Sequence, residues 1–322
     1  MNAVLQLLKW LCVTQGTKTA VGTVLAAVAN REEGRARAAN VGAVEAVVAA
    51  LRQHSMLPEV ALPACETLWR LSEDAGVCQL VAAAGGADAV VAAMAAHPQA
   101  AALQAAGCGV VACLACSDDL QVKAVAAAGV DSVMAALSAH GGAEGEVTVA
   151  RQGSEALAKL SADADNCVMV AASGGIHASM QVIAAHRHDP VVQEAAYAAL
   201  CYMSCSAATQ ENAVAAGGVA ALVAGMTAHP GNFAVQDMGC QALGMLGRAS
   251  ASHTLTIASQ GGVERVVAAL RAHPLRIGVQ IAGSEVRASV HPQRPTAAQC
   301  PACACACPRA LAGVVRPRAA QE

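Results

Sequence analysis

The sequence predicts an all-α solenoid, in which a unit of three helices is repeated along the chain. One phrase, a glycine turn followed by a valine-rich stretch and a histidine, recurs six times at intervals of 44, 43, 46, 43 and 44 residues. A period of about 40 to 47 residues with two or three helices per unit is typical of helical repeat arrays. The composition, 56% hydrophobic but only 2% aromatic, favours closely spaced alanine-rich helices over a core of large rings. The phrase begins at Gly42, Gly86, Gly129, Gly175, Gly218 and Gly262.

The copy at residues 206–248 shows the three predicted helices most clearly. A short first helix from Gln210 ends at Gly217 and Gly218, where a positive φ lets the chain reverse direction. The second helix has apolar residues at the i, i+3, i+4, i+7 spacing of one buried face, and Pro230 stops it. A third helix begins at Val235. The apolar positions of the second helix are Val219, Leu222, Val223 and Met226.

Three regions of different character divide the chain. Residues 1–30 fit the second and third helix of a partial unit, and residues 31–289 hold about six units, the last incomplete. From residue 290 the leucine pattern disappears, and a proline- and cysteine-rich composition predicts a disordered, low-complexity tail. We expect either a fragment of a longer array or a mispredicted final exon.

Two local features depart from the regular pattern. Pro63 falls inside a predicted third helix, where proline costs about 3 kcal/mol. We expect that helix to be shortened and to start at Pro63, with a kink as the alternative. The glycine-rich run at residues 140–146 accounts for the longest interval and predicts a mobile loop.

The order of these helices resembles the armadillo repeat over roughly residues 16–290. The resemblance rests on a short helix, a small-residue turn, an LxxLL-like second helix and a third helix of the pattern VQ(E)xAxxAL. It implies a right-handed superhelix whose third helices line a concave groove, in which extended peptides of partner proteins lie. Nuclear-import adaptors of this family hold basic peptides with a tryptophan followed four residues later by asparagine. Trp69 and Asn30 are the matching residues here, and they stand in different copies, so binding of lysine-rich import signals is not expected.

Candidate groove residues are few, because binding energy concentrates in Trp, Tyr and Arg anchors and this chain has few of them. Two alternatives stay open. Trp69 could be buried in the core with its N–H satisfied, and the glutamines Gln104, Gln193 and Gln236 could be solvated helix starts. The resemblance implies that these glutamines open third helices and bond a peptide backbone. The predicted groove residues are Trp69, Arg70, Gln104, Arg151, Gln193, Tyr197, Tyr202, Gln236 and Arg248.

One histidine per unit forms a column at the end of the second helices. Neighbouring helices pack about 8 to 10 Å apart, whereas zinc binds nitrogen at about 2.0 to 2.1 Å, so a metal ribbon is not expected. We expect each imidazole to bond the last carbonyls of its own helix. The histidines are His54, His97, His140, His186, His229 and His273.

The cysteines are expected to act mainly as small packing residues, Cys167 and Cys205 among them. Cys113 and Cys116 have redox or metal spacing, but no second pair accompanies them within the repeats. The tail cluster from Cys300 to Cys307 is the one group that could hold a soft metal, and a disulfide is not expected in a reducing compartment. No metal or other cofactor is predicted.

Composition and motifs also argue against several functions. A net charge of -3 offers no footprint for nucleic acid. The charge-free stretch at residues 89–117 is long enough to span a membrane, but the equivalent stretch one unit later is charged, which favours a buried hairpin. The amino-terminal segment lacks a basic signal region, so we expect a cytoplasmic protein, with a nuclear location left open. Catalytic motifs are absent from the sequence, and the paired aspartates at 118–119 and at 163 and 165 fit helix caps.

The predicted function is therefore a non-enzymatic scaffold that binds an extended segment of a partner protein and takes no small-molecule substrate. The alternative is an architectural segment of a larger cytoskeletal or organelle-associated assembly. An adaptor for ubiquitin transfer is a weaker third option.

Overall fold

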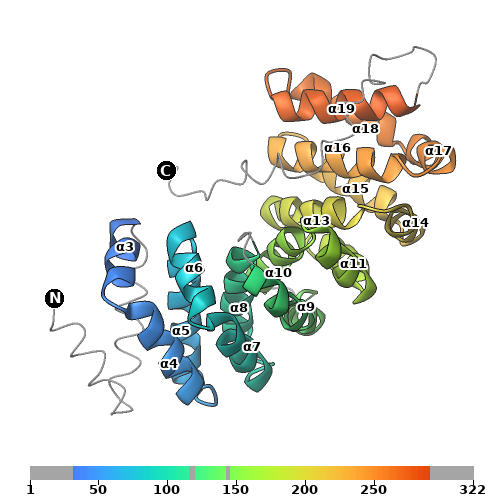
Figure 1. The fold of residues 1–322 in the computed structure, drawn as a ribbon. Helices are drawn as coiled ribbons and strands as arrows, with labels where there is room; N and C mark the ends of the chain where they lie inside the picture. The colour runs from blue at the N-terminus through green and yellow to red at the C-terminus, as the bar shows by residue number, and fades with distance from the viewer. Residues whose placement is uncertain (1–31, 116–119, 143–145, 291–322) are drawn as a thin grey trace. The chain divides into compact units, whose positions relative to one another are not determined.

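Alanine- and valine-rich runs between glycine corners fold as helices in all parts of the chain that the structure describes. That structure is a computed structural model, and it describes residues 32–115, 120–142 and 146–290 (Figure 1). Within these residues there are helices and turns but no strands. The chain divides into two compact units, residues 1–140 and 141–322.

The first unit contains two complete three-helix repeats and the beginning of a third. In it α5 packs on α8, α8 on α9, and α4 on α7. Its helices are α3 (Glu32–Asn40), α4 (Ala43–Gln53), α5 (Pro58–Ser72), α6 (Ala75–Ala83), α7 (Gly86–Ala96), α8 (Ala101–Leu114) and α9 (Leu120–His140).

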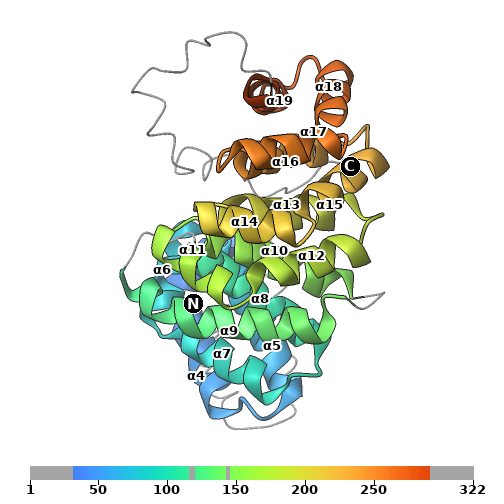
Figure 2. The same cartoon turned by 90° about the vertical axis from the view of Figure 1, so that its right-hand side faces the viewer.

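The second unit begins with the third helix of a repeat and continues with three complete triplets. Its third helices α10, α13, α16 and α19 each pack on the next, and Figures 1 and 2 both show α13, α16 and α19 as successive layers. The predicted all-α repeat array is confirmed. The helices are α10 (Val147–Leu160), α11 (Ala164–Ala172), α12 (Gly175–Ala185), α13 (Pro190–Met203), α14 (Ala207–Ala215), α15 (Gly218–Ala228), α16 (Phe233–Gly247), α17 (Ala251–Ser259), α18 (Gly262–Ala272) and α19 (Ile277–Val290).

A glycine in the left-handed region forms the corner between first and second helices. The second glycine of each pair is needed for close packing: a Cβ at Gly218 would lie 2.7 Å from the Ala213 carbonyl oxygen. The recurring phrase aligns Gly42 with Gly86, the second glycine of a pair. In the structure α4 begins at Ala43 and α7 at Gly86, so Gly42 corresponds to the first glycine of the pair instead. The corner glycines are Gly42, Gly85, Gly174, Gly217 and Gly261.

The third copy departs from this pattern, because its first and second helices form the single helix α9. Ala128 stands where the other copies have the corner glycine. A left-handed conformation costs a residue with a Cβ about 1–2 kcal/mol, so the chain continues as a helix through Gly129. The prediction of two separate helices in this copy was wrong.

Pro63 lies inside α5 and does not start it, which corrects the expectation of a shortened helix. The helix begins at Pro58, where a missing N–H has no consequence for the first turn. Because proline has no N–H, Pro63 removes one helical bond to the carbonyl four residues earlier. Pro63 lies in the second turn, so the rest of the helix continues to Ser72. Thr67 Oγ1 donates a hydrogen bond to the Pro63 carbonyl (2.7 Å) and adds a local contact.

The leucines of the third helices form the core, as their spacing predicts. Leu68, Leu157, Leu200 and Leu243 are fully buried. First helices begin at side-chain caps, which include Asp163 as expected and also Asp74, Ser206 and Ser250. The expectations about residues 1–30, Asp118 and Asp119, the centre of the glycine-rich loop and the tail concern segments outside the described residues.

The described helices are short or only partly apolar compared with a membrane span. None of them alone has both the length and the apolar composition for a span, although three bent pairs pass together by those two criteria. The pairs are Ala75–Ala83 with Gly86–Ala96, Ala164–Ala172 with Gly175–Ala185, and Ala207–Ala215 with Gly218–Ala228.

Candidate functional site

The candidate binding residues are aromatic and arginine side chains of the third helices, or of the residue that ends them, and all but Arg151 lie near the C-terminal end. Trp69 and Arg70 of α5 are both half-buried in the first unit. In the second unit Arg151 and Tyr202 are half-buried, and Arg248 is exposed. We call Trp69 and Arg70 the third-helix surface of the first unit, and Arg151, Tyr202 and Arg248 the third-helix surface of the second. They include all of the aromatic and arginine candidates predicted from the sequence except Tyr197.

Trp69 is half-buried and lies between the core and the surface. Its indole rests against α8, where a Cβ on Gly109 would come within 2.6 Å of the Trp69 Nε1 atom. The Arg70 guanidinium stacks on the outer side of the ring, 4.7 Å from its centroid, a cation–π contact. Glu73 holds Arg70 at 3.6 Å and Arg35 at 3.1 Å.

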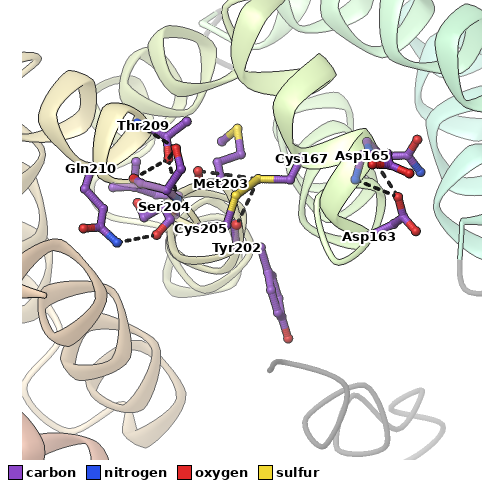
Figure 3. The surroundings of a disulfide bond; sticks show 12 residues. Asp163, Asp165, Cys167, Tyr202, Met203, Ser204, Cys205, Thr209 and Gln210 are labelled. Carbon is purple, nitrogen blue, oxygen red and sulfur yellow. Dashed lines mark hydrogen bonds between the residues drawn. A yellow bond between two sulfur atoms is a disulfide. The ribbon is translucent and has the colours of Figure 1, made fainter. Parts of the chain in front are cut away.

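In the second unit the surface residues differ in how firmly they are held. With the Gln152 amide oriented to satisfy both side chains, its oxygen accepts from Arg151 Nη2 (2.9 Å) and Nε (3.1 Å). Arg248 Nη2 lies 3.3 Å from Glu285 of α19, an exposed pair that contributes little to stability. Tyr202 leaves the last turn of α13, and Figure 3 shows its ring pointing away from the sulfur atoms nearby.

The predicted groove glutamines are in the core instead, which corrects the assignment of Gln104, Gln193 and Gln236. Each is at most 2% exposed. Gln193 Nε2 donates to the carbonyls of Ile183 (2.9 Å) and His186 (3.1 Å), at the end of the second helix. Gln104, Gln236 and Gln280 make the same pair of bonds. They satisfy carbonyls that have no partner within their own helix, so they are neither peptide contacts nor solvated helix starts.

Tyr197 is also a core residue and leaves the list of surface candidates. Its side chain is fully buried, and its hydroxyl donates to the carbonyls of Leu222 (3.2 Å) and Ala221 (3.4 Å) in α15. Gly225 leaves the space for this hydroxyl, because a Cβ there would collide with it. Burial raises the pKa of Tyr197. The sequence held a signal for this placement, since Gln193, Tyr197 and Leu200 share one helical face.

The histidine column connects repeats rather than finishing single helices. Each Nε2 donates to the carbonyl of the residue that follows the histidine of the preceding repeat, which differs from the expected bond within one helix. The carbonyl only accepts, so Nε2 carries the proton. The bonds are His97 to Ser55 (2.7 Å), His140 to Pro98 (2.8 Å), His186 to Gly141 (2.8 Å), His229 to Arg187 (2.8 Å) and His273 to Pro230 (3.0 Å).

Four cysteine thiols lie in surroundings that suppress their reactivity. Burial raises the pKa of Cys65, Cys108, Cys201 and Cys240 to about 12. A thiol with such a pKa carries almost no thiolate at neutral pH. Among the described residues, no three His, Cys, Asp or Glu side chains come together in a metal-binding group. Cys116 and the tail cysteines lie outside those residues.

Cys167 and Cys205 differ from these four, because a disulfide joins them (Figure 3). The expectation that both are packing thiols was wrong. Cys167 lies in α11, and Cys205 lies just beyond the end of α13 in the same repeat. The sequence alone gave no reason to choose this pair, since the two residues are 38 positions apart.

Comparison with solved structures identifies the type of repeat. A designed armadillo repeat protein in complex with the peptide (KR)4 matches with a TM-score of 0.63 and 14% identity, over 77% of this chain and 99% of that chain. The chain has an armadillo-type fold. An engineered protein from the Northeast Structural Genomics Consortium matches with a TM-score of 0.67 and 18% identity, over 77% and 98% of the two chains.

A third solved structure has a similar fold. A structure from work on the interaction between cadherin and beta-catenin matches with a TM-score of 0.66 and 17% identity, over 83% of this chain and 48% of that chain. No protein-family model and no curated protein matches the sequence. At these identities the similarity establishes the armadillo-type fold and leaves the activity to be argued from the residues.

Proposed function

We propose that this protein is a non-enzymatic scaffold that binds an extended segment of a partner protein along its third helices. The observation that carries the proposal is the stacked pair of Trp69 and Arg70 on α5, an aromatic anchor with a polar outer face. Tyr202 and Arg248 supply residues of the same two types in the second unit. Trp, Tyr and Arg are the side chains that contribute most at protein interfaces.

The chemistry of the surface favours a partner of mixed charge. Acidic residues lie beside the surface arginines: Glu73 is 3.6 Å from Arg70, and Glu285 is 3.3 Å from Arg248. Neither sign of charge dominates, and the net charge of the chain is only -3. The basic peptide bound by the designed armadillo protein is therefore not the expected ligand. The arginines are the donors available to a peptide backbone, since the buried glutamines are already used.

The same reasoning extends to the partners that we do not expect. We propose that the chain binds neither nucleic acid nor a small-molecule substrate and does not insert into membranes, which leaves protein as its partner class. A cytoplasmic location, with a nuclear one left open, is part of this proposal.

Selection from a library of random twelve-residue peptides tests the scaffold proposal. Peptides that bind the full chain should lose affinity at least tenfold against Trp69→Ala or Tyr202→Ala, measured by fluorescence anisotropy. The matched control is Val168→Ala, which shortens a 62% exposed side chain on the first helix α11. Selected peptides that bind both surface variants with unchanged affinity would contradict the proposal.

The architectural alternative is supported by one apolar face in the second unit. Leu275, Ile277 and Ile281, at and before α19, are 91%, 75% and 58% exposed, and they line an open pocket with Gln280 and Ser284. A contiguous exposed apolar patch marks a protein contact. In this alternative, second copies of the chain associate through this face. Light scattering should then show assembly that grows with concentration in the wild type and disappears in Ile277→Asp, whereas a scaffold of the first kind stays monomeric.

A further inference from the structure

We propose that Cys167 and Cys205 are a reversible dithiol–disulfide site, opened and closed by the glutathione couple, that fixes the end of α13 beside α11. This assigns a modification site to the fourth repeat. Its effect on Tyr202, argued below, rests on the proposed scaffold function.

The two cysteines occupy complementary positions. Cys167 is completely buried, four residues after Asp163, the cap of α11. Cys205 is exposed, between Ser204 and Ser206. Its neighbours are held firmly: Gln210 Nε2 donates to the Ser204 carbonyl (2.9 Å), and Ser206 forms a capping box with Thr209 (Figure 3). The segment therefore holds the exposed Cys205 in bonding contact with the buried Cys167, at a place that solvent can reach.

In the reduced state the Cys167 thiol has hydrogen-bond acceptors nearby. Cys167 Sγ lies 3.6 Å from the Tyr202 carbonyl oxygen and 3.7 Å from that of Met203, so a thiol at this position has an acceptor. Cys78 shows this state in another repeat: it follows the cap Asp74 by four residues, remains a thiol, and donates to the Cys113 carbonyl at 3.4 Å. Cys113 is the counterpart of Tyr202. Because both states satisfy the buried sulfur, the bond can open without leaving a polar group unpaired.

The exchange reaction begins at the exposed sulfur. A glutathione thiolate attacks Cys205 Sγ, the bond between the two cysteines breaks, and Cys167 leaves as a thiolate that takes up a proton. A second glutathione thiolate attacks the glutathione sulfur of the mixed disulfide and releases Cys205. The products are two protein thiols and one glutathione disulfide, so two glutathiones are oxidised as the protein disulfide is reduced. The reverse sequence closes the bond.

Closing the bond has a mechanical consequence for α13. The bond ties the residue just beyond α13 to the middle of α11, with the two Cα atoms 7.3 Å apart. Tyr202 is three residues before Cys205, in the last turn of α13. Reduction should release this turn, and the third-helix surface of the second unit should loosen with it.

Peptide mapping of the full chain tests the site directly. The protein is equilibrated in glutathione buffers of graded ratio, alkylated, digested without reductant and analysed by mass spectrometry. We expect Cys167 and Cys205 to be linked in oxidised buffer and both alkylated in reduced buffer. Glutathione attached to Cys205 beside an alkylated Cys167 in oxidised buffer would overturn the proposal, as would a link that reduced glutathione leaves intact.

Two variants and hydrogen exchange complete the experiment. Cys205→Ser should abolish the link, whereas Cys113→Ser, a half-buried cysteine of α8, should leave it unchanged. Amides in α11 and in the last turn of α13 should exchange at least fivefold faster after reduction in the wild type, and equally in both buffers in Cys205→Ser. Equal exchange in the wild type would overturn the coupling to α13. Failure of peptide selection concerns the scaffold proposal alone, because the mapping needs no partner.

Discussion

Polar side chains in this core bond the last backbone carbonyls of neighbouring helices. Gln236 Nε2 bonds the carbonyls of Met226 (2.8 Å) and His229 (2.9 Å), and the Tyr197 hydroxyl bonds that of Leu222. The last carbonyls of a helix have no partner within it, and in a stack of short helices many such ends are buried. Gln236 and Tyr197 are therefore as much core residues here as the leucines.

The glutamine bonds lead to a stability prediction. Gln236→Ala should lower the free energy of unfolding by about 1–3 kcal/mol, because the buried Met226 carbonyl loses its donor, whereas the His229 carbonyl keeps the Asn232 N–H (3.1 Å). The matched control is Gln241→Ala, five residues later on α16, where the amide bonds the half-buried Asp237 side chain (2.9 Å). Urea denaturation followed by circular dichroism measures both. Equal midpoints for the two variants would show that the buried bonds contribute nothing.

Tyr197 leads to a prediction about high pH. Burial raises the pKa of its phenol in the folded chain, whereas the phenol in an unfolded chain titrates near its ordinary value of about 10. The stabilisation is complete below that value and is lost as the pH rises above it, since only the unfolded chain then releases the proton. Wild type should therefore lose more stability than Tyr197→Phe between about pH 9 and pH 11. Comparison of the two proteins cancels the contribution of the cysteines, and parallel pH profiles would contradict the prediction.

At the scale of helices, the corner glycine decides whether one helix or two are formed. Gly217 adopts a φ of 85° between α14 and α15, whereas Ala128 in the same place lets α9 run on for 21 residues. The sequence predicted the paired helices because the glycine pair is visible in it. It did not predict α9, since a single remaining glycine at 129 was read as a turn.

Gly217 allows a test of this corner free of packing effects. A Cβ at Gly217 would meet no atom within 4 Å, so Gly217→Ala should be destabilising through its backbone conformation alone, by about 1–2 kcal/mol. Gly231→Ala is the matched control, because that site is equally open and its φ is not positive. Thermal denaturation compares the two. A control variant that loses as much stability as Gly217→Ala would remove the explanation.

At this scale the sequence did not predict which atom each polar side chain or cysteine bonds. Helix faces, leucine positions and the cap Asp163 follow from local spacing, and they were predicted correctly. The acceptor of His97 is a carbonyl 42 residues earlier, and the partner of Cys167 is 38 residues later. Both distances are about one repeat, and only the stacking geometry decides which atoms meet. Trp69, which is held between α5 and Gly109 of α8, shows the same dependence on the next repeat.

At the scale of the whole molecule, the histidine column repeats one contact along each unit. In a helical array each repeat contacts only its neighbours, and stability is approximately a sum of repeat and interface terms. A bond that recurs at each described interface therefore contributes to the cooperativity of the array as well as to its stability. His186 is the most informative member of the second unit, because both it and its acceptor Gly141 are buried.

His186→Ala should consequently weaken one interface more than it weakens the rest of its unit. The Gly141 carbonyl would lose its donor, which costs about 1–3 kcal/mol for a buried group, and the imidazole volume would be lost as well. Native-state hydrogen exchange should show reduced protection in α10 to α12, with smaller changes in α17 to α19, because coupling decays from one repeat to the next. The exposed His188, two residues later, provides the control variant His188→Ala, for which protection should stay at the wild-type level. A uniform loss of protection across α10 to α19 would show instead that the second unit unfolds as one block and that the column does not divide it into separately stabilised interfaces.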